Sequence, residues 1–255
     1  MVTYKEFREE MLKNLEKYYH LVNFSGWKKI AEKRISGEYT ELKAKTILDC
    51  GCGWGEFIVS ALKHGAEVCV CLEPDADKIR LCRMRFRLHG VEQRAIIIQG
   101  IGEYLLFKNN SFDLVISNSV LEHVQEPCKV IKEMVRVSKK YVFIHCPNYL
   151  FPREQHYKVF WLPCMPKNLA KIYLRARKKN PNFITTINYI TPISLKKCLS
   201  MIEGIKFEHT IKHRLANQNL IIKHKFLGKI VKILRIPPDL IALFLPNIDV
   251  LIEKV

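Results

Sequence analysis

Short apolar segments alternate with amphipathic segments through the middle of this 255-residue chain. The apolar segments are five to nine residues long and nearly free of charge, which is typical of strands buried on both faces of a sheet. Between them, apolar residues recur every three to four positions, as in helices. This alternation predicts an α/β, doubly wound fold with a mostly parallel sheet. The predicted strands are 46–50, 66–73, 94–100, 111–118 and 140–148, and the predicted helices between them are 55–65, 74–90 and 126–138.

The pattern differs on either side of this core. Residues 3–36 are helical in pattern, with a break at 23–26, and beyond Asn148 the alternation stops. A helix resumes at Thr191 as N-cap with Pro192 in its first turn. We therefore divide the chain into four parts. They are an N-terminal helical cap (1–44), the alternating core (45–148), an inserted basic and aromatic lid (149–190, with a helix at 166–179), and a C-terminal part (191–255, with a helix at 191–204, strands at 205–215 and 247–255, and an amphipathic basic segment).

A glycine-rich stretch, TILDCGCGWGE at 46–56, joins the first strand to the first core helix. Gly51, Gly53 and Gly55 occupy alternate positions where the backbone must turn and leave room for a ligand beside a helix N-terminus. The spacing differs from the G-x-G-x-x-G of dinucleotide-binding proteins. Glu73, at the end of the second strand, can accept both hydroxyls of a ribose. The pattern indicates a nucleoside-binding site.

Four motifs in this order resemble those of class I S-adenosylmethionine-dependent methyltransferases, in particular the ubiquinone-biosynthesis and glycan-tailoring enzymes. They are ILDCGCGWGEF, CLEPDADKI, FDLVISNSVLEHV and YVFIHCPN, and they span residues 46–148. The resemblance implies a Rossmann-like sheet of seven strands with an antiparallel last strand. It also implies S-adenosyl-L-methionine as cofactor.

The resemblance also implies which residues meet the cofactor. Where the family commonly has Gly-Asp-Ala-Glu after the third strand, this chain has Gly100-Ile101-Gly102-Glu103, so backbone at Gly102 and apolar contact with Ile101 would have to replace a polar adenine contact. The implied set is Asp49, Gly51, Gly53 and Gly55 around the methionine part and ribose, Glu73 on the ribose hydroxyls, Pro74, Asp75, Gly102 and Glu103 near the adenine, Asn118 and Ser119 facing the methyl group, and Trp27 closing over the cofactor or packing the cap onto the sheet.

Methyl transfer needs a base only when the acceptor is a hydroxyl or a protonated amine. Three histidines follow or end core strands: His123, His145 and His156. We expect His145 to be buried in its strand. His156, which forms a Glu-x-His pair with Glu154, is our first catalytic candidate. His123 is the second, with packing under the cofactor loop as the alternative.

The nine cysteines include no Cys-x-x-Cys pair. Cys50 and Cys52, like Cys69 and Cys71, are two apart in or beside a strand and so share one face. We therefore predict no metal site and buried thiols in a reducing compartment. The chain starts without an apolar signal region, and no segment is long enough to span a bilayer. We expect a cytoplasmic protein, with peripheral contact at the inner face of a membrane left open.

The net charge of +17 is concentrated in one region. Residues 151–235 hold 18 lysines and arginines against 3 acidic residues, whereas residues 1–150 hold 23 against 19. Basic residues interleaved with apolar ones suit anionic lipid headgroups, a phosphate-bearing substrate or RNA. We expect an anionic small-molecule, glycan or lipid-linked acceptor. The methylated atom is expected to be oxygen, and nitrogen is left open. We also expect residues 221–245 to contact a membrane.

Two other functions stay open. An RNA methyltransferase could use the basic C-terminal half. However, Ser117-Asn118-Ser119-Val120 lacks the Asn/Asp-Pro-Pro-aromatic signature of base-amine methyltransferases, and no RNA-binding module is evident. A non-catalytic relative acting as a binding protein is the second alternative, and the intact glycines and Glu73 argue against it. The sequence does not predict the oligomeric state.

Overall fold

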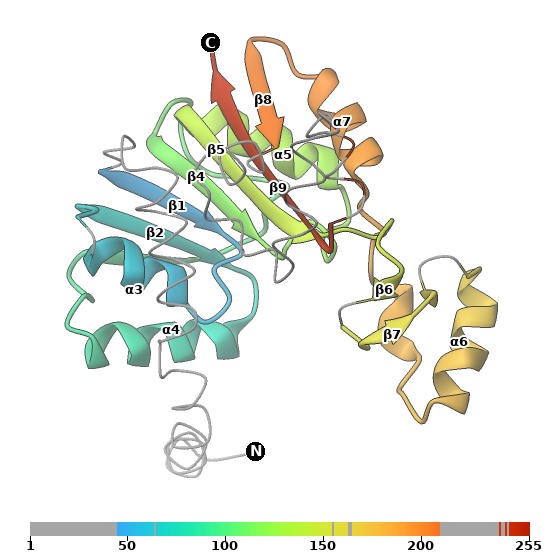
Figure 1. Ribbon diagram of the computed structural model, residues 1–255. Helices are drawn as coiled ribbons and strands as arrows, with labels where there is room; N and C mark the ends of the chain where they lie inside the picture. Colours follow the sequence, from blue (N-terminus) through green and yellow to red (C-terminus); the bar gives the residue numbers. More distant parts are fainter. Residues whose placement is uncertain are drawn as a thin grey trace, which may run out of the picture.

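A computed structural model describes residues 45–63, 65–154, 156–162, 165–209, 240, 243 and 245–255. The predicted helical cap, with Trp27, and most of the basic segment 221–245 lie outside these residues. The core is a seven-stranded sheet in the order β3-β2-β1-β4-β5-β9-β8 (Figure 1). The strands are β1 (Thr46–Cys50), β2 (Val68–Glu73), β3 (Ala95–Gln99), β4 (Phe112–Asn118), β5 (Ser138–Pro147), β8 (Ile205–His209) and β9 (Asn247–Lys254).

Strand directions confirm the predicted sheet. The pairings from β3 through β5 are all parallel, whereas β9 pairs antiparallel with both β5 and β8. The strand order changes direction at β1: β2 and β3 lie on one side of β1, and β4 lies on the other. In open α/β sheets, ligands bind at the carboxyl ends of the strands near such a switch point.

Helices cover both faces of the sheet, as predicted. Side chains of α3 (Glu56–Lys63) and α4 (Ala76–Leu88) pack on one face, and those of α5 (Pro127–Val137) and α7 (Pro192–Ser200) pack on the other. Neighbouring strand residues alternate between the two layers. Ile47 belongs to the first core and Leu48 to the second, and both are almost fully buried.

Local capping sets two helix starts where the sequence predicts them. Asp75 accepts hydrogen bonds from the backbone N–H groups of Asp77 and Lys78 and so caps α4. Thr191 and Ser194 form a reciprocal capping box at the start of α7. Such caps bind N–H groups that have no partner inside the helix.

The lid at 149–190 folds as a lobe that projects beyond the sheet (Figure 1). It contains α6 (Lys167–Ala176), a short 3-10 helix (Asn182–Thr185) and a hairpin of β6 (Arg153–Glu154) and β7 (Val159–Phe160). The sequence predicts the basic helix but not the hairpin. The lobe has a small apolar core of its own, made of Val159, Leu162, Ala170, Leu174 and Ile184.

Two cysteines correct the prediction of free thiols. Cys128 on α5 and Cys198 on α7 form a disulfide that links two neighbouring helices. Six other cysteines in the described part of the chain are buried and free, as expected. Disulfides are rare in reducing compartments, so this bond does not support the predicted reducing, cytoplasmic location. That location stays a prediction. Within the described ranges, no helix has both the length and the hydropathy needed to cross a bilayer.

Candidate active site

The glycine loop requires glycine at two of its three positions for lack of space. Gly51, Gly53 and Gly55 all have positive φ angles, of 84°, 55° and 73°. A Cβ on Gly51 would overlap the side chain of Val120, and one on Gly55 would lie 2.7 Å from the ring of Phe86. A Cβ on Gly53 would meet no atom of the described residues within 4 Å. Gly51 and Gly55 therefore allow close packing, whereas the space beside Gly53 is open to a ligand.

Glu73 lies against this loop, as the sequence predicts. Glu73 is 3% exposed, and its carboxylate accepts hydrogen bonds from the backbone N–H of Gly53 at 2.9 Å and of Asp75 at 3.2 Å. Lys78 Nζ is 3.6 Å from the same carboxylate. A carboxylate has about four acceptor positions, so Glu73 can also accept from ribose hydroxyls.

Asp49 and Asn118 each have a buried side-chain oxygen that has no hydrogen-bond partner among the described residues. Both atoms, Asp49 Oδ1 and Asn118 Oδ1, are inaccessible to solvent. Burial, with a smaller contribution from Glu73, raises the pKa of Asp49 to about 8. Buried polar atoms without partners are rare in proteins and are expected where a ligand binds. These oxygens fit a ligand that brings hydrogen-bond donors or positive charge, as S-adenosylmethionine does.

The remaining predicted cofactor residues have other contacts in the structure. Glu103 accepts a hydrogen bond from the backbone of Gln125 at 3.0 Å, so it holds the loop that follows β4. Gly102 packs so closely that a Cβ would lie 3.0 Å from Cys50 Sγ. The Pro74 carbonyl accepts from the Gln99 side chain. Their contact with the cofactor remains a prediction.

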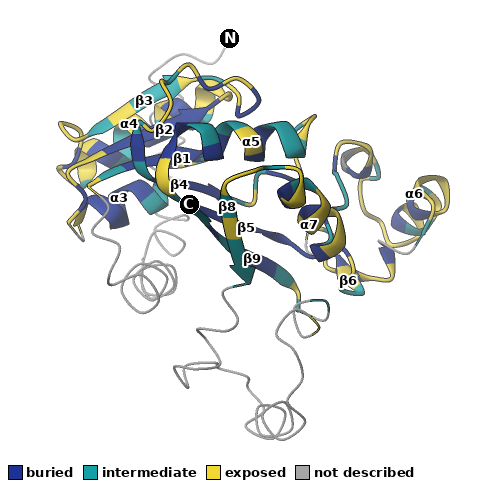
Figure 2. Ribbon diagram, turned by 90° about the horizontal axis from the view of Figure 1, so that it is seen from above, coloured by how far each residue is buried: buried dark blue, intermediate teal, exposed yellow. Residues whose placement is uncertain are grey.

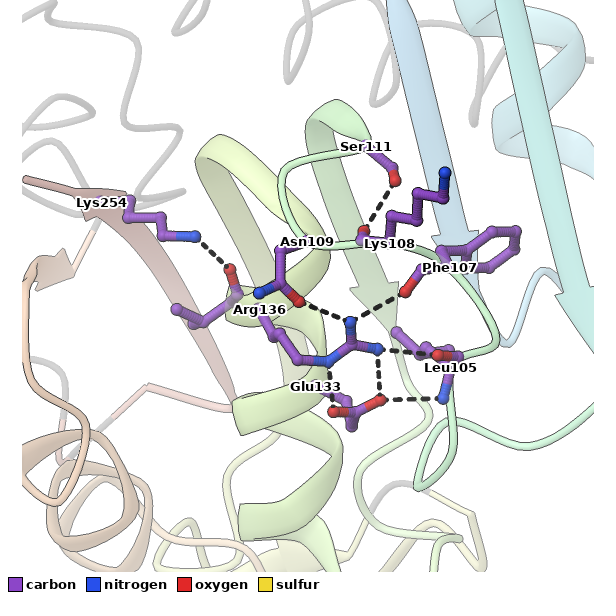
Figure 3. Close-up of polar contacts among 9 residues, drawn as sticks. Leu105, Phe107, Lys108, Asn109, Ser111, Glu133, Arg136 and Lys254 are labelled. Atoms are coloured by element: carbon purple, nitrogen blue, oxygen red, sulfur yellow. Dashed lines mark hydrogen bonds and ion pairs between the residues drawn. The ribbon is translucent and has the colours of Figure 1, made fainter.

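Arg136 of α5 anchors the segment that contains Gly102 and Glu103. Figure 3 shows its guanidinium donating to the carboxylate of Glu133, to the carbonyls of Leu105 and Phe107, and to the side chain of Asn109. Glu133 in turn accepts from the backbone N–H of Leu105. This network has a structural role: it holds the chain between β3 and β4 against α5.

Ser119 starts the loop after β4 in a left-handed conformation, with φ of 57°. Its N–H donates to the carbonyl of His145 at 2.7 Å. His145 itself is buried and pairs with Asp249 of β9, so it has the core role that the sequence predicts. This loop connects the cofactor side to the lid, because Val120 packs on Gly51 and Glu122 and His123 follow directly.

The two catalytic candidates come together although the sequence separates them by the whole of β5. The rings of His123 and His156 lie edge to face with their centroids 5.3 Å apart. His156 Nδ1 is 2.7 Å from Glu154 Oε1 and 3.3 Å from the hydroxyl of Tyr149. Glu154 also accepts from the backbone N–H of Tyr157 at 2.6 Å. The predicted Glu154–His156 pair is therefore present.

Glu122 is a member of this cluster that the sequence analysis did not select. It is fully buried, and neither carboxylate oxygen has a hydrogen-bond partner in the described part of the chain. Its Oε1 lies 3.9 Å from His123 Nε2. The residue stands in the LEHV motif beside His123, but only the folded chain shows that its carboxylate is buried.

The surroundings shift the pKa values of the cluster in different directions. Burial raises the pKa of Glu122 to about 7 and lowers that of His123, whereas the hydrogen bond to Glu154 raises the pKa of His156. Burial tends to raise the pKa of Glu154, but hydrogen bonds from His156 and Tyr157 outweigh it and leave the pKa lowered. Shifted ionisable groups of this kind are typical of functional sites.

The end of the lid is bonded to the same loop. The backbone N–H of Asn188 donates to the carbonyl of Glu122 at 2.7 Å, and its side chain donates to the carbonyl of Val124. Tyr149 and Tyr189 stack with their centroids 4.8 Å apart, and Tyr149 N–H donates to the carbonyl of Ile190. The cluster is therefore held from both the core and the lid.

Comparison with known proteins agrees with this geometry. Residues 48–145 match the family model of a methyltransferase domain. Norajmaline N-methyltransferase from Rauvolfia serpentina is 31% identical over 96 residues, which are 38% of this chain and 33% of that protein. Ubiquinone biosynthesis O-methyltransferase from Xanthomonas oryzae pv. oryzae is 31% identical over 103 residues, 39% of this chain and 41% of that protein. The alignments thus span well under half the length of these curated relatives.

Solved structures share the fold over more of the chain. An S-adenosylmethionine-dependent methyltransferase from Mesorhizobium loti superposes with a TM-score of 0.56, covering 88% of this chain and 98% of that one at 16% identity. Such low identity shows the fold alone. The matched domain, the shared fold, the glycine loop and the Glu73 contact together identify residues 48–145 as a methyltransferase domain with the fold of S-adenosylmethionine-dependent methyltransferases.

Proposed function

We propose that this protein transfers a methyl group from S-adenosylmethionine to an oxygen atom of an anionic small-molecule, glycan or lipid-linked acceptor. One observation carries the proposal. The loop after β4 packs on Gly51 at one end and joins the Glu122–His123–Glu154–His156 cluster at the other. The nucleoside-binding elements and a set of ionisable groups are thereby adjacent.

The chain's own residues would bind and orient the cofactor. Glu73 would accept the ribose hydroxyls, while the buried oxygens of Asp49 and Asn118 would face its polar and positively charged atoms. The cofactor supplies an activated methyl group on a sulfonium, so the protein needs mainly to position the acceptor and exclude water.

The ionisable cluster supports an oxygen acceptor. A hydroxyl must lose its proton as the bond to the methyl carbon forms, whereas a neutral amine needs no base. The Glu154–His156 pair would receive that proton, because Glu154 stabilises the protonated imidazole at 2.7 Å. The relatives include both N- and O-methyltransferases, so the acceptor atom is part of the proposal.

The lid surface supports an anionic, lipid-linked acceptor. On α6, Ala170 and Leu174 are buried in the lobe, but Leu169 and Ile172 are 57% and 61% exposed. Figure 2 shows exposed residues along this helix. Basic residues stand near the exposed apolar ones in the sequence, namely Lys167, Lys171 and Arg175 on α6 and Arg177, Lys178 and Lys179 directly after it. An apolar face among lysines and arginines favours the interface of an anionic membrane.

Titration calorimetry with S-adenosylmethionine and S-adenosylhomocysteine tests the first part of the proposal. Methyl transfer from labelled cofactor to sugar nucleotides, lipid-linked glycans and quinone precursors tests the second. Folded protein that binds neither nucleoside would refute the enzymatic proposal and favour a binding protein of the same fold. Transfer to RNA, with steeply salt-dependent binding, would favour the nucleic-acid alternative.

A further inference from the structure

Three side chains of the cluster converge at the junction of the core and the lid. Glu122, His123 and His156 each place one ligand-type atom so that these atoms all lie within 4.8 Å of one another. We propose that Glu122, His123 and His156 bind a divalent transition-metal ion. The sequence predicts no metal site, because it offers only cysteine pairs with unsuitable spacing and separates His123 from His156 by 33 positions.

The distances need only a small adjustment to reach metal coordination. A zinc ion binds nitrogen and oxygen ligands at about 2.0–2.2 Å, which places tetrahedral ligand atoms about 3.5 Å apart. Glu122 Oε1 and His123 Nε2 are 3.9 Å apart. The three ligand-type atoms are within 4.8 Å of one another, so the pairs would have to close by at most about 1.3 Å to complete the site.

The burial of Glu122 is an independent reason to expect a cation. Its carboxylate is fully buried and its two oxygens have no hydrogen-bond partner among the described residues. Burial of a carboxylate that accepts no hydrogen bonds is costly, and proteins offset the cost with a paired charge or a metal ion. A divalent ion bound by both histidines would supply that partner.

The surroundings of His156 are those of a metal ligand. Metal-binding histidines usually donate their second ring nitrogen to a carboxylate, which fixes the ring. Glu154 is 2.7 Å from His156 Nδ1, so the ring would ligate through Nε2. Asn188 bonds the lid to the Glu122 carbonyl and thereby fixes the distance between the two parts of the site.

The ligand set indicates the class of metal. Two imidazoles and one carboxylate suit zinc, iron and similar transition ions, whereas magnesium and calcium prefer oxygen ligands alone. The protein would supply three ligands to the ion, which leaves one coordination position for an acceptor oxygen. This consequence rests on the proposed function: the ion would lower the pKa of the bound acceptor hydroxyl, so that its proton would pass to solvent before methyl transfer, and His156 would hold the ion instead of receiving that proton.

Titration of chelator-treated, full-length protein with Zn²⁺, without an affinity tag, tests the site. We expect one ion per chain and no comparable binding of Mg²⁺. Glu122→Gln and His156→Ala should each weaken Zn²⁺ binding at least about tenfold. His89→Ala, at the C-cap of α4, and Glu203→Gln, after α7, are matched controls that should leave Zn²⁺ binding unchanged. Co²⁺ should give visible absorption bands that both cluster variants lose.

Affinity for S-adenosylhomocysteine, measured on the same samples, shows that the variants are folded. If Glu122→Gln does not fold, Zn²⁺ binding and the Co²⁺ spectrum of His156→Asn test the metal site instead. Zn²⁺ binding that is absent, or that survives both cluster substitutions, would overturn the metal site. Nucleoside binding without metal binding would refute only this inference, whereas metal binding without nucleoside binding would refute only the methyltransferase proposal.

Discussion

The carboxylate of Glu73 accepts a hydrogen bond from the backbone N–H of Gly53 at 2.9 Å, which ties the end of β2 to the glycine loop. Gly53 is the loop position where an added Cβ would meet no neighbour within 4 Å in the part of the chain that the structure describes. The contact therefore places the carboxylate next to the open part of the loop.

Replacing Glu73 should weaken nucleoside binding more than it lowers the stability of the fold. Hydrogen bonds to a charged group contribute about 1.5–3 kcal/mol, so Glu73→Ala should weaken S-adenosylhomocysteine binding roughly 10- to 100-fold in calorimetry. Glu67→Ala is the control, because Glu67 is exposed and pairs only with Lys45 among the described residues. Equal affinities of wild type and Glu73→Ala would contradict the assigned role.

Alanine at Gly51 should destabilise the fold through one neighbour. The added Cβ would overlap Val120, and φ of 84° is unfavourable for alanine. We expect a loss of about 2–4 kcal/mol in urea denaturation.

A second substitution separates the two causes. Val120→Ala removes the overlapping methyl groups, so it should be less harmful in the Gly51→Ala background than in the wild type. A double-mutant cycle should give a coupling of about 1 kcal/mol or more. Additive effects would show that backbone strain alone accounts for the loss.

Asp113 should make stability dependent on acidic pH. It accepts hydrogen bonds from the backbone of Lys45 and Thr46, the Thr46 hydroxyl and Lys139. Burial opposes ionisation, but these partners outweigh it and lower the pKa of Asp113 to about 2. The stabilisation is therefore complete above pH 4 and is lost as the pH falls toward 2.

The substitution Asp113→Asn tests this dependence. Allowing for partial exposure, we expect it to cost about 1–2 kcal/mol at pH 7. The difference from wild type should shrink progressively in denaturation curves at pH 5, 3.5 and 2.5. Asp77→Asn, at an exposed surface pair, should have little effect at any pH. A difference that does not change with pH would contradict the assignment.

Features set by neighbouring residues could be predicted from the sequence. The glycine loop, the Asp75 cap and the Thr191 capping box each depend on a few consecutive positions. Features set by distant residues could not. The Cys128–Cys198 disulfide joins residues 70 positions apart, and no local pattern indicates it. Glu122 lies beside His156 and Asn188 of the lid, which are distant in the sequence. The hairpin strands of the lid have two residues each and are too short to show a period.

His156→Ala should slow methyl transfer without weakening nucleoside binding. His156 either receives the acceptor's proton or, in the metal site inferred above, holds the ion that lowers the pKa of the acceptor oxygen. A positioned acid or base contributes about 10²- to 10⁴-fold to a rate, and we expect a loss in kcat within this range for either role. The affinity for S-adenosylhomocysteine should stay within about twofold, because Glu73 and the glycine loop are unchanged. Unchanged turnover with the true acceptor would remove His156 from the mechanism.

The lid surface should bind anionic membranes through its exposed apolar residues and its charge. Trp161 is 60% exposed and Ile172 is 61% exposed, and basic residues of α6 lie close to Ile172 in the sequence. In co-sedimentation with phosphatidylglycerol vesicles at low salt, Trp161→Ser with Ile172→Ser should reduce the bound fraction severalfold. Lys171→Glu with Arg175→Glu should reduce it further, because the charges then repel the headgroups.

A control that removes an exposed apolar side chain outside the lid makes this experiment specific. Leu106 is 94% exposed in the segment between β3 and β4, outside the lid, so Leu106→Ser should leave vesicle binding unchanged. Binding of wild type should also fall as salt is raised, since screening weakens the attraction between charges. If Leu106→Ser lowered binding as much as the lid variants, adsorption would be non-specific. If wild type did not sediment at all, the lid would not contact anionic membranes, and the acceptor would have to be sought among soluble compounds.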